Sequence, residues 1–227
     1  MARALVLRHH LEDRPGLIGD ALVARGFELD VVLMDEGSGT PSVVGYDLVL
    51  VLGSKHAVYD EQIEEAWFGR ELNVLAHAHE LGVPIFGICF GAQALCRLHG
   101  GVVAPSSDPE IGWYEVTAVN DSGVAPGPWF EYHYDVCTLP DEAVLWASSE
   151  RAVQAFSIGR DVGVQFHPEV DDLQLAEWFA VENDEGREVG AMHAALIAQT
   201  KLETPAARLR AVDLVDLVLG HFSTWSA

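Results

Sequence analysis

The fold of this chain is decided by the stretch Val83-Pro84-Ile85-Phe86-Gly87-Ile88-Cys89-Phe90-Gly91-Ala92-Gln93. Its apolar first half suits a buried strand, and a helix-forming run begins directly after the cysteine. Glycines stand two residues before and two residues after Cys89. A side chain at the apex of a sharp strand-to-helix turn needs small neighbours, because the backbone must turn without collision. We therefore predict a strand at 84–88, a helix from Phe90, and Cys89 at the turn between them.

The same alternation of strand-like and helix-like stretches occupies the first half of the chain. Aliphatic runs at 4–7, 28–33 and 48–52 predict three further strands. Amphipathic stretches from Pro15-Gly16 to about 26, and from 61 to 80, predict helices between them. Strands that alternate with helices are typical of βαβ units. We expect an α/β fold with an open, mostly parallel central sheet flanked by helices, in a three-layer, flavodoxin-like arrangement.

The second half of the chain has a different texture. Gly, Pro, Asp and Ser punctuate short runs over 100–165, which predicts hairpins and loops attached to the sheet. Beyond His167 the pattern predicts helices at 173–181, 189–201 and 205–219. The length suits one domain over 1–227, with a core over about 1–185 and a C-terminal helical extension over about 186–227.

Composition limits the partners and the compartment. Thirteen Lys and Arg against 35 Asp and Glu give a net charge of −22, which repels phosphates, so we expect no nucleic-acid partner. The apolar residues never form the roughly 20-residue uncharged stretch of a membrane span, and the apolar part of the N-terminal run is too short for a secretory signal, so we expect neither. Three cysteines, an odd number, argue against a disulfide framework and favour a cytoplasmic location.

We expect neither a cofactor nor a metal site. None of His77, His79 and His99 has a nearby cysteine or carboxylate at metal-ligand spacing along the sequence. His77, His79 and His99 fall in or at the ends of predicted helices, and we assign them to surface or packing positions.

Cys89 has two interpretations. An arbitrary cysteine is usually a small buried hydrophobe. At a helix N-terminus, however, unsatisfied N–H groups and the macrodipole favour the thiolate, and a merely packed cysteine needs neither glycine. We predict that Cys89 is a nucleophile, whereas Cys96 and Cys137 lack this setting and are predicted to be structural.

A thiol that attacks an amide needs a proton shuttle, and histidine has the appropriate chemistry. His167 follows an apolar strand and precedes Pro168, and Glu169 lies two residues beyond it. In an extended segment residues i and i+2 project to the same side, so the carboxylate can hold one imidazole nitrogen while the other faces the thiol. We predict a triad of Cys89, His167 and Glu169. His9 and His10 end the first strand at the sheet edge where α/β folds bind ligands, and both a rim role and a packing role stay open for them.

With these two segments the chain resembles the class I glutamine amidotransferases, whose signatures are Gly-x-Cys-x-Gly-x-Gln and a downstream His-x-Glu. It looks closest to stand-alone members similar to the amidotransferase half of GMP synthase. The resemblance implies that glutamine is the substrate and that a covalent γ-glutamyl thioester forms. No phosphate-cradling glycine-rich loop followed by Lys and Ser/Thr occurs in the chain, so a synthetase partner is implied as the consumer of the ammonia.

The resemblance also implies roles around the triad. The loop containing Gly53 and Ser54 aligns with a family loop that usually reads Gly-Gly-Pro, so the backbone N–H groups of Ser54 and Phe90 are implied as the oxyanion hole. Ser54-Lys55 replaces the usual Gly-Pro, and whether the loop is preformed or rearranges on glutamine binding stays open. Gly53 and Gln93 are implied in the substrate pocket.

A looser match concerns the segment Tyr132-His133-Tyr134-Asp135, which resembles a Trp-His-Gly-Asp segment near the α-groups of glutamine. It implies substrate contacts for His133 and Asp135, and the alternative is a hairpin with outward polar residues. The segment 110–113 also resembles the family, with no chemical role beyond packing.

Two other functions remain open. A γ-glutamyl peptide or amide hydrolase would use the same triad, and the pocket beyond the scissile amide, built from loops 54–60 and 106–113, would distinguish it. A non-catalytic binding module would retain the fold, but the intact triad argues against it. In the coupled case we expect weak glutamine hydrolysis by the isolated chain.

Overall fold

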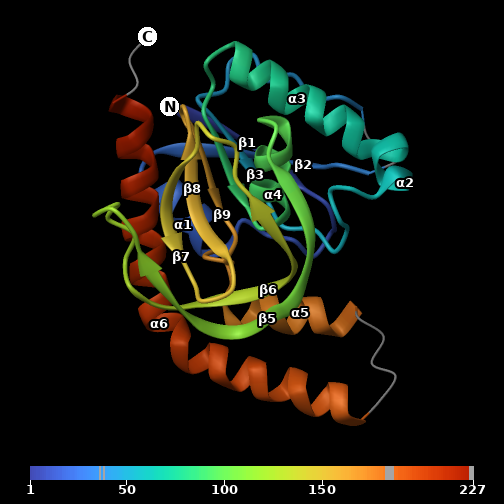
Figure 1. Cartoon of the computed structure of the whole chain (residues 1–227), viewed down its shortest axis with the longest axis vertical. Coiled ribbons are helices and arrows are strands. Elements are labelled where there is room, and N and C mark those ends of the chain that lie inside the picture. The colour runs from blue at the N-terminus through green and yellow to red at the C-terminus, as the bar shows by residue number, and fades with distance from the viewer. Residues whose placement is uncertain (36, 38, 182–186, 225–227) are drawn as a thin grey trace.

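A central β-sheet organises the molecule (Figure 1). The computed structural model describes residues 1–35, 37, 39–181 and 187–224. Within these residues the sheet has nine strands in the order β2-β1-β3-β4-β9-β8-β7-β5-β6. The strands are β1 (Ala2–Arg8), β2 (Phe27–Leu33), β3 (Leu48–Val51), β4 (Ile85–Ile88), β5 (Val102–Ala118), β6 (Gly127–Thr138), β7 (Val144–Ser148), β8 (Val153–Ile158) and β9 (Asp161–Val164).

The sheet is mixed. The strands β2, β1, β3, β4 and β9 are parallel to one another, and β9, β8, β7, β5 and β6 continue the sheet in antiparallel pairs. The predicted α/β class with flanking helices is therefore confirmed, and the four strands predicted in the first half all form. The carboxyl ends of β1, β3, β4 and β9 meet at one edge of the sheet, where open α/β folds bind ligands.

Helices cover both faces of the sheet. They are α1 (Gly16–Ala24), α2 (Glu61–Ile63), the π-helical turn η1 (Glu64–Phe68), α3 (Gly69–Glu80), α4 (Phe90–Leu98), α5 (Asp172–Val181) and α6 (Arg187–Thr224). Alternation along β1 separates two apolar layers, because successive strand side chains point to opposite faces. Ala4 and Val6 pack in the core that contains residues of α1 and α6, whereas Leu5 and Leu7 pack in the core that contains residues of α3 and α4.

The C-terminal helix differs from expectation. The two helices predicted at 189–201 and 205–219 form one helix, α6, with Pro205 inside it. Figure 1 shows α6 as two arms that meet at an angle. An interior proline lacks an N–H donor and crowds the preceding turn, so it bends a helix without necessarily ending it. Although α6 is long, no helix among the described residues is long and apolar enough to cross a membrane.

The part of α6 that follows Pro205, its upper arm in Figure 1, packs in the same apolar core as α1. Its buried residues Ala211, Leu214 and Val218 share one apolar cluster with Leu17 and Ile18 of α1. The predicted boundary between core and extension, at about 185/186, lies outside the described residues. Because α6 and α1 share a core, we propose that the chain forms one domain.

The region predicted as hairpins and loops, 100–165, extends the sheet. The stretch 104–109, expected as a loop, lies inside β5, where the pairing with β6 shifts register between Pro105 and Glu110. The last strand of the region, β9, returns to the parallel part beside β4. This return brings the segment that follows β9 next to the turn that follows β4.

Candidate active site

Cys89 lies at the turn between β4 and α4 with a strained backbone. Its φ of 51° and ψ of −103° are rare for a residue with a side chain. A Cβ on Gly87 would lie 2.5 Å from the backbone of Gly91, and a Cβ on Gly91 would lie 2.5 Å from the carbonyl oxygen of Val51. The two glycines are therefore required by the close approach of α4 to β3 and β4, as the spacing predicted.

The segment after β9 carries the second half of the site. Nδ1 of His167 lies 2.7 Å from Oε1 of Glu169, and both side chains are buried. The backbone N–H of His167 donates to the carbonyl of Phe130 at 2.7 Å, and the carbonyl of Glu169 accepts from Leu17 at 2.9 Å. The strand β6 and the start of α1 therefore hold this segment from two sides.

The electrostatics of His167 favour its protonated form. Burial lowers the pKa of His167, but the charges of Glu169 and Cys89, with the hydrogen bond to Glu169, raise it well above its usual range. Nε2 of His167 is buried and makes no hydrogen bond of standard geometry within the described part of the chain. The imidazole is thus oriented through Nδ1 and has its other nitrogen available near the sulfur.

His9 holds the loop that follows β3 through a hydrogen bond to a backbone carbonyl of that loop. Nδ1 of His9 lies 2.7 Å from the carbonyl oxygen of Gly53, and Nε2 lies 2.9 Å from Oε2 of Glu71. The Gly53 carbonyl is an acceptor, and so is an ionised Glu71 carboxylate, so this arrangement suits a ring that carries a proton on each nitrogen. Burial lowers the pKa of His9, but the Glu71 carboxylate and the Gly53 carbonyl raise it overall. A Cβ on Gly53 would lie 2.9 Å from Cε1 of His167, so the loop also packs directly against the imidazole.

Two glutamine side chains link α4 to the sulfur. Nε2 of Gln93 donates to Oε1 of Gln165 at 3.2 Å, and Nε2 of Gln165 contacts Sγ of Cys89 at 3.5 Å. Gln93, which was expected in the substrate pocket, lines the cavity described below and also holds Gln165. The amide of Gln165 is therefore the group that approaches the sulfur from this side.

His133 is tied to carboxylates. Its Nδ1 donates to the carbonyl of Asp135 at 3.0 Å, and its Nε2 lies 3.2 Å from Glu110 and 3.3 Å from Glu131. Burial lowers the pKa of His133, but its bonds to Glu110 and Glu131 raise it to about 10. Burial raises the pKa of Glu131 to about 7, although His133 opposes the shift. His133 is thus a buried cation inside a network that includes Glu110, from the segment expected only to pack.

One cavity of about 850 Å³ connects these groups. Seven of the nine predicted site residues line it: Gly53, Ser54, Cys89, Gln93, His133, Asp135 and His167. Glu169 lies behind His167, and the ring of Phe90 is buried 4.8 Å from that of His9. The mouth is bridged by Tyr59, whose hydroxyl donates to Asp135 at 2.7 Å.

Sequence reasoning missed several of these residues. Gln165 and Tyr59 were not singled out, and His9 was left between a rim role and packing. Gln165 stands two residues before His167 in a strand-like run, so the alternation of side chains was a usable signal for it. The partner of His9 lies 62 residues away and gave no local signal.

A family model described as "Glutamine amidotransferase class-I" matches residues 16–175. The chain belongs to the class I glutamine amidotransferase family. The resemblance carried by the segments around Cys89 and His167 is thereby confirmed.

The individual proteins that this chain resembles are consistent with the family match. GMP synthase (glutamine-hydrolyzing) of Escherichia coli O127:H6 and of Shigella flexneri is 36% identical over 111 residues, which cover 41% of this chain and 21% of that relative. The match thus spans about a fifth of the length of these relatives. A glutamine amidotransferase from Thermotoga maritima has a TM-score of 0.83 and 26% identity, covering 96% of this chain and 98% of that one. A glutamine amidotransferase from Methylobacillus flagellatus shares the fold, with a TM-score of 0.84, 20% identity and coverage of 97% and 95%.

Proposed function

We propose that this amidotransferase releases ammonia from the side-chain amide of glutamine, with Cys89 as nucleophile, His167 as proton shuttle and Glu169 as the group that orients it. The observation that carries the proposal is the strained turn at Cys89 beside a buried imidazole that Glu169 holds at 2.7 Å. Strained residues cluster at functional sites, and packing gives no reason for this conformation at a cysteine.

The proposed reaction has two halves. Sγ of Cys89 attacks the amide carbon of glutamine, the C–N bond breaks, and ammonia leaves with a proton delivered by His167. The γ-glutamyl thioester remains on Cys89. Water, losing its proton to His167, then attacks the thioester carbon, the C–S bond breaks, and glutamate leaves.

The negative oxygen of each tetrahedral intermediate needs nearby donors. We assign this role to the backbone N–H groups of Ser54 and Phe90, with Gly53, Gln93, His133 and Asp135 around the substrate. Support for Ser54 comes from the buried bond between His9 and the carbonyl of Gly53, which fixes the peptide that carries this N–H. A preorganised donor is worth far more than one that must reorient during the reaction.

The ammonia acceptor is proposed to be bound by a synthetase that is a partner protein of this chain. Similarity to GMP synthases supports such a partner. So does similarity to the crystal structure of a putative GMP synthase subunit from Thermoplasma acidophilum, with a TM-score of 0.68, 20% identity and coverage of 99% and 96%. The free thiols of Cys89, Cys96 and Cys137 fit the proposed cytoplasmic location.

A second candidate uses the same acyl-enzyme to hydrolyse γ-glutamyl peptides or amides. The cavity of about 850 Å³ favours it, because cavities of roughly 300–1,000 Å³ hold drug-sized ligands and leave room beyond a glutamine. Pro105, Ser106 and Pro109 of β5 line the cavity together with Tyr59, and we assign the additional space to them.

Steady-state assays of the purified chain on glutamine and on γ-glutamyl dipeptides test both candidates. Glutamine turnover that a synthetase partner increases is the result expected of the main proposal, and Cys89→Ala should abolish it. Rapid cleavage of dipeptides by the chain alone would replace it with the hydrolase. Turnover that survives in Cys89→Ala would reject both.

A further inference from the structure

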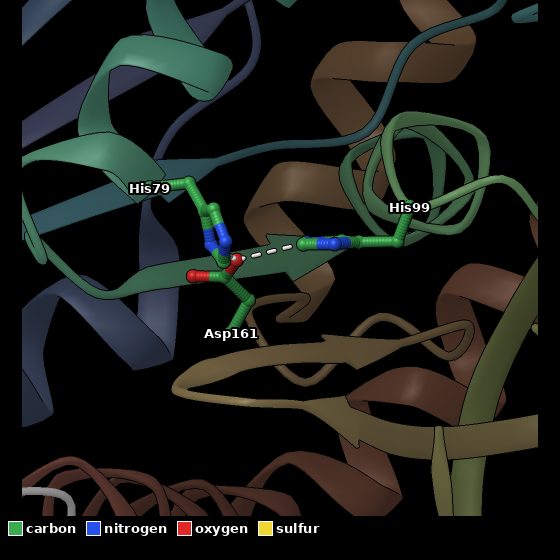
Figure 2. A group of neighbouring side chains, drawn as sticks. All are labelled: His79, His99 and Asp161. Carbon is green, nitrogen blue, oxygen red and sulfur yellow. Dashed lines mark hydrogen bonds and ion pairs between the residues drawn. The ribbon is translucent and has the colours of Figure 1, made fainter. Parts of the chain in front are cut away.

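Three potential metal ligands converge at the amino ends of the parallel strands, at the opposite edge from the cavity. His79 lies in the last turn of α3, His99 caps the C-terminus of α4, and Asp161 begins β9. Figure 2 shows both imidazoles directed at one carboxylate. Nδ1 of His79 lies 2.9 Å from Oδ2 of Asp161, and Nε2 of His99 lies 3.0 Å from the same oxygen.

We propose that His79, His99 and Asp161 bind a divalent transition metal of the zinc class, with water in the fourth position. This site goes beyond the proposed function and uses none of the residues around Cys89. Imidazole nitrogen and carboxylate oxygen are ligands that Zn²⁺ prefers, and three protein ligands with an open position are a common arrangement.

The distances are close to those a metal requires. Zn–N and Zn–O bonds of about 2.0–2.2 Å give tetrahedral ligand–ligand separations of about 3.3–3.5 Å. The three ligand atoms lie within 4.8 Å of one another, with both N···O distances near 3 Å. Insertion of a metal therefore requires the two N···O distances to lengthen by a few tenths of an ångström and the two imidazole nitrogens to sit at a similar separation. The side chain of His79, which is 48% exposed, has room for this adjustment.

The carboxylate is already oriented for this role. Asp161 is buried, and its Oδ1 accepts the backbone N–H of Ile85 at 3.1 Å, so Oδ2 is the oxygen presented to the imidazoles. Such a hydrogen bond to the non-ligating oxygen is typical of the groups that orient metal ligands. The C-terminal ends of α3 and α4 meet here and add partial negative charge, which favours a cation.

The other cluster of His and carboxylates is a weaker candidate. It comprises Glu110, Glu131 and His133. Because bonds to the two carboxylates outweigh burial and raise the pKa of His133 to about 10, its imidazole is protonated and has no lone pair for a metal. The ion pair itself supplies the cation that this cluster needs.

A bound metal would stabilise the position of the C-terminal end of α4, the helix that begins after Cys89. It would join α4 to α3 and to the starts of β4 and β9, all of which belong to the parallel half of the fold. We therefore expect the metal to raise the thermal midpoint, since a ligand that binds only the folded state stabilises it.

The test is equilibrium dialysis of the full chain against Zn²⁺ in a Cys89→Ala background, which removes the sulfur next to His167 as a competing ligand. One equivalent should bind, and His79→Gln and His99→Gln should each weaken binding by at least about 10- to 100-fold, the loss seen when even an outer-shell partner is removed. His77→Gln is the matched control, because His77 is an exposed histidine in the same turn whose ion pair is with Glu80.

Two readouts decide the outcome. Zn²⁺ should raise the thermal midpoint of the background chain and of His77→Gln, and leave His79→Gln and His99→Gln unchanged. Failure of the background chain to bind Zn²⁺ would overturn the proposal. Full binding by the His79 and His99 variants, or equal loss in the His77 variant, would also overturn it.

Discussion

His9 holds the carbonyl oxygen of Gly53 through a buried hydrogen bond of 2.7 Å. Since the C=O and N–H of a trans peptide point in opposite directions, this bond fixes the N–H of Ser54 as well. Flipping the peptide would leave a buried charged donor unpaired, at a cost of about 1.5–3 kcal/mol. The loop that contains Ser54-Lys55 is thus anchored by a buried side chain at β1's carboxyl end.

We predict that His9→Gln lowers kcat by about 10- to 100-fold, less than the 10²–10³-fold typical of losing an oxyanion-hole donor outright. KM should change less than kcat, because in the proposed mechanism the loop stabilises charge that appears only in the transition state. Initial-rate kinetics on glutamine measure both parameters. A rise in KM alone would assign His9 to substrate binding, and His77→Gln on the surface of α3 controls for a general loss of histidine.

The hydrogen bond between His167 and Glu169 predicts which of two variants loses more turnover. His167→Ala should reduce turnover more than Glu169→Gln, because in the proposed mechanism the histidine transfers the proton whereas the carboxylate orients it. Glu169→Gln retains an acceptor oxygen near Nδ1 and should keep partial activity. Equal, full activity in both variants would remove the triad from the mechanism. Circular dichroism checks that each variant is folded.

Gln165 gives a prediction for a residue with no expected role. Its amide contacts the sulfur at 3.5 Å and is itself held by Gln93. A donated hydrogen bond stabilises a thiolate, so Gln165→Leu should slow alkylation of Cys89 by iodoacetamide. Gln93→Leu should slow it less, because it releases Gln165 without removing it. Unchanged alkylation in Gln165→Leu would show that the contact does not affect the sulfur.

The strands and helices of the first half were predictable because their signals are local. Apolar runs such as 48–52, separated by helical stretches, specify βαβ units without knowledge of distant contacts. The continuity of α6 through Pro205 was not predictable in this way. The part of α6 after Pro205 is stabilised by apolar contacts with α1, which lies nearly 200 residues earlier in the chain. This tertiary packing overrode the local signal of the proline.

The residues of the candidate site also fall into two groups, those with a local sequence signal and those whose partners are distant in the sequence. Cys89 between its glycines, and His167 two residues before Glu169, are motifs whose geometry follows from neighbouring residues. His9 and Glu71, by contrast, are 62 residues apart, and His79 and Asp161 are 82 apart. Metal-ligand spacing along the sequence could not reveal the latter pair, because His79 lies in α3 and Asp161 lies in β9.

The buried ion pairs predict how stability varies with pH. Because its bonds to Glu110 and Glu131 outweigh burial, the pKa of His133 is raised to about 10, so the folded state retains a proton that the unfolded state loses near 6.5. This contribution is complete below pH 6.5 and is lost as pH rises to about 10. Burial raises the pKa of Glu131 to about 7, so its contribution also falls as pH rises, over about 4.5 to 7.

Urea unfolding at pH 5, 7 and 9 should therefore show decreasing free energies of unfolding. Glu131→Gln replaces a protonated carboxyl by a neutral group of the same shape, so it should flatten the decrease between pH 5 and 7. Its effect at pH 7 is on the order of 3 kcal/mol at most, from 1.36 kcal/mol per pKa unit. Stability that rises from pH 7 to 9 would contradict the assignment of His133 as a buried cation.

The hydrogen bond between Tyr59 and Asp135 joins the loop after β3 to β6 across the mouth of the cavity. Burial, with this bond, raises the pKa of Tyr59 to about 12, so the hydroxyl remains a donor throughout the neutral range. Tyr59→Phe removes the bond but keeps the ring. Because the bond lies at the mouth and not beside Cys89, we expect KM to rise while kcat on glutamine stays within about twofold, as for lost uniform binding.

The same variant separates the two candidate substrates. If γ-glutamyl dipeptides are the substrates, their second residue occupies the space next to Tyr59, and their KM should change more than that of glutamine. If glutamine is the substrate, its KM should respond and dipeptides should remain poor substrates of both chains. Parallel kinetics of wild type and Tyr59→Phe on the two substrates distinguish these results. A fall in kcat with unchanged KM would instead mean that the bond acts on the reacting groups and not on entry to the cavity.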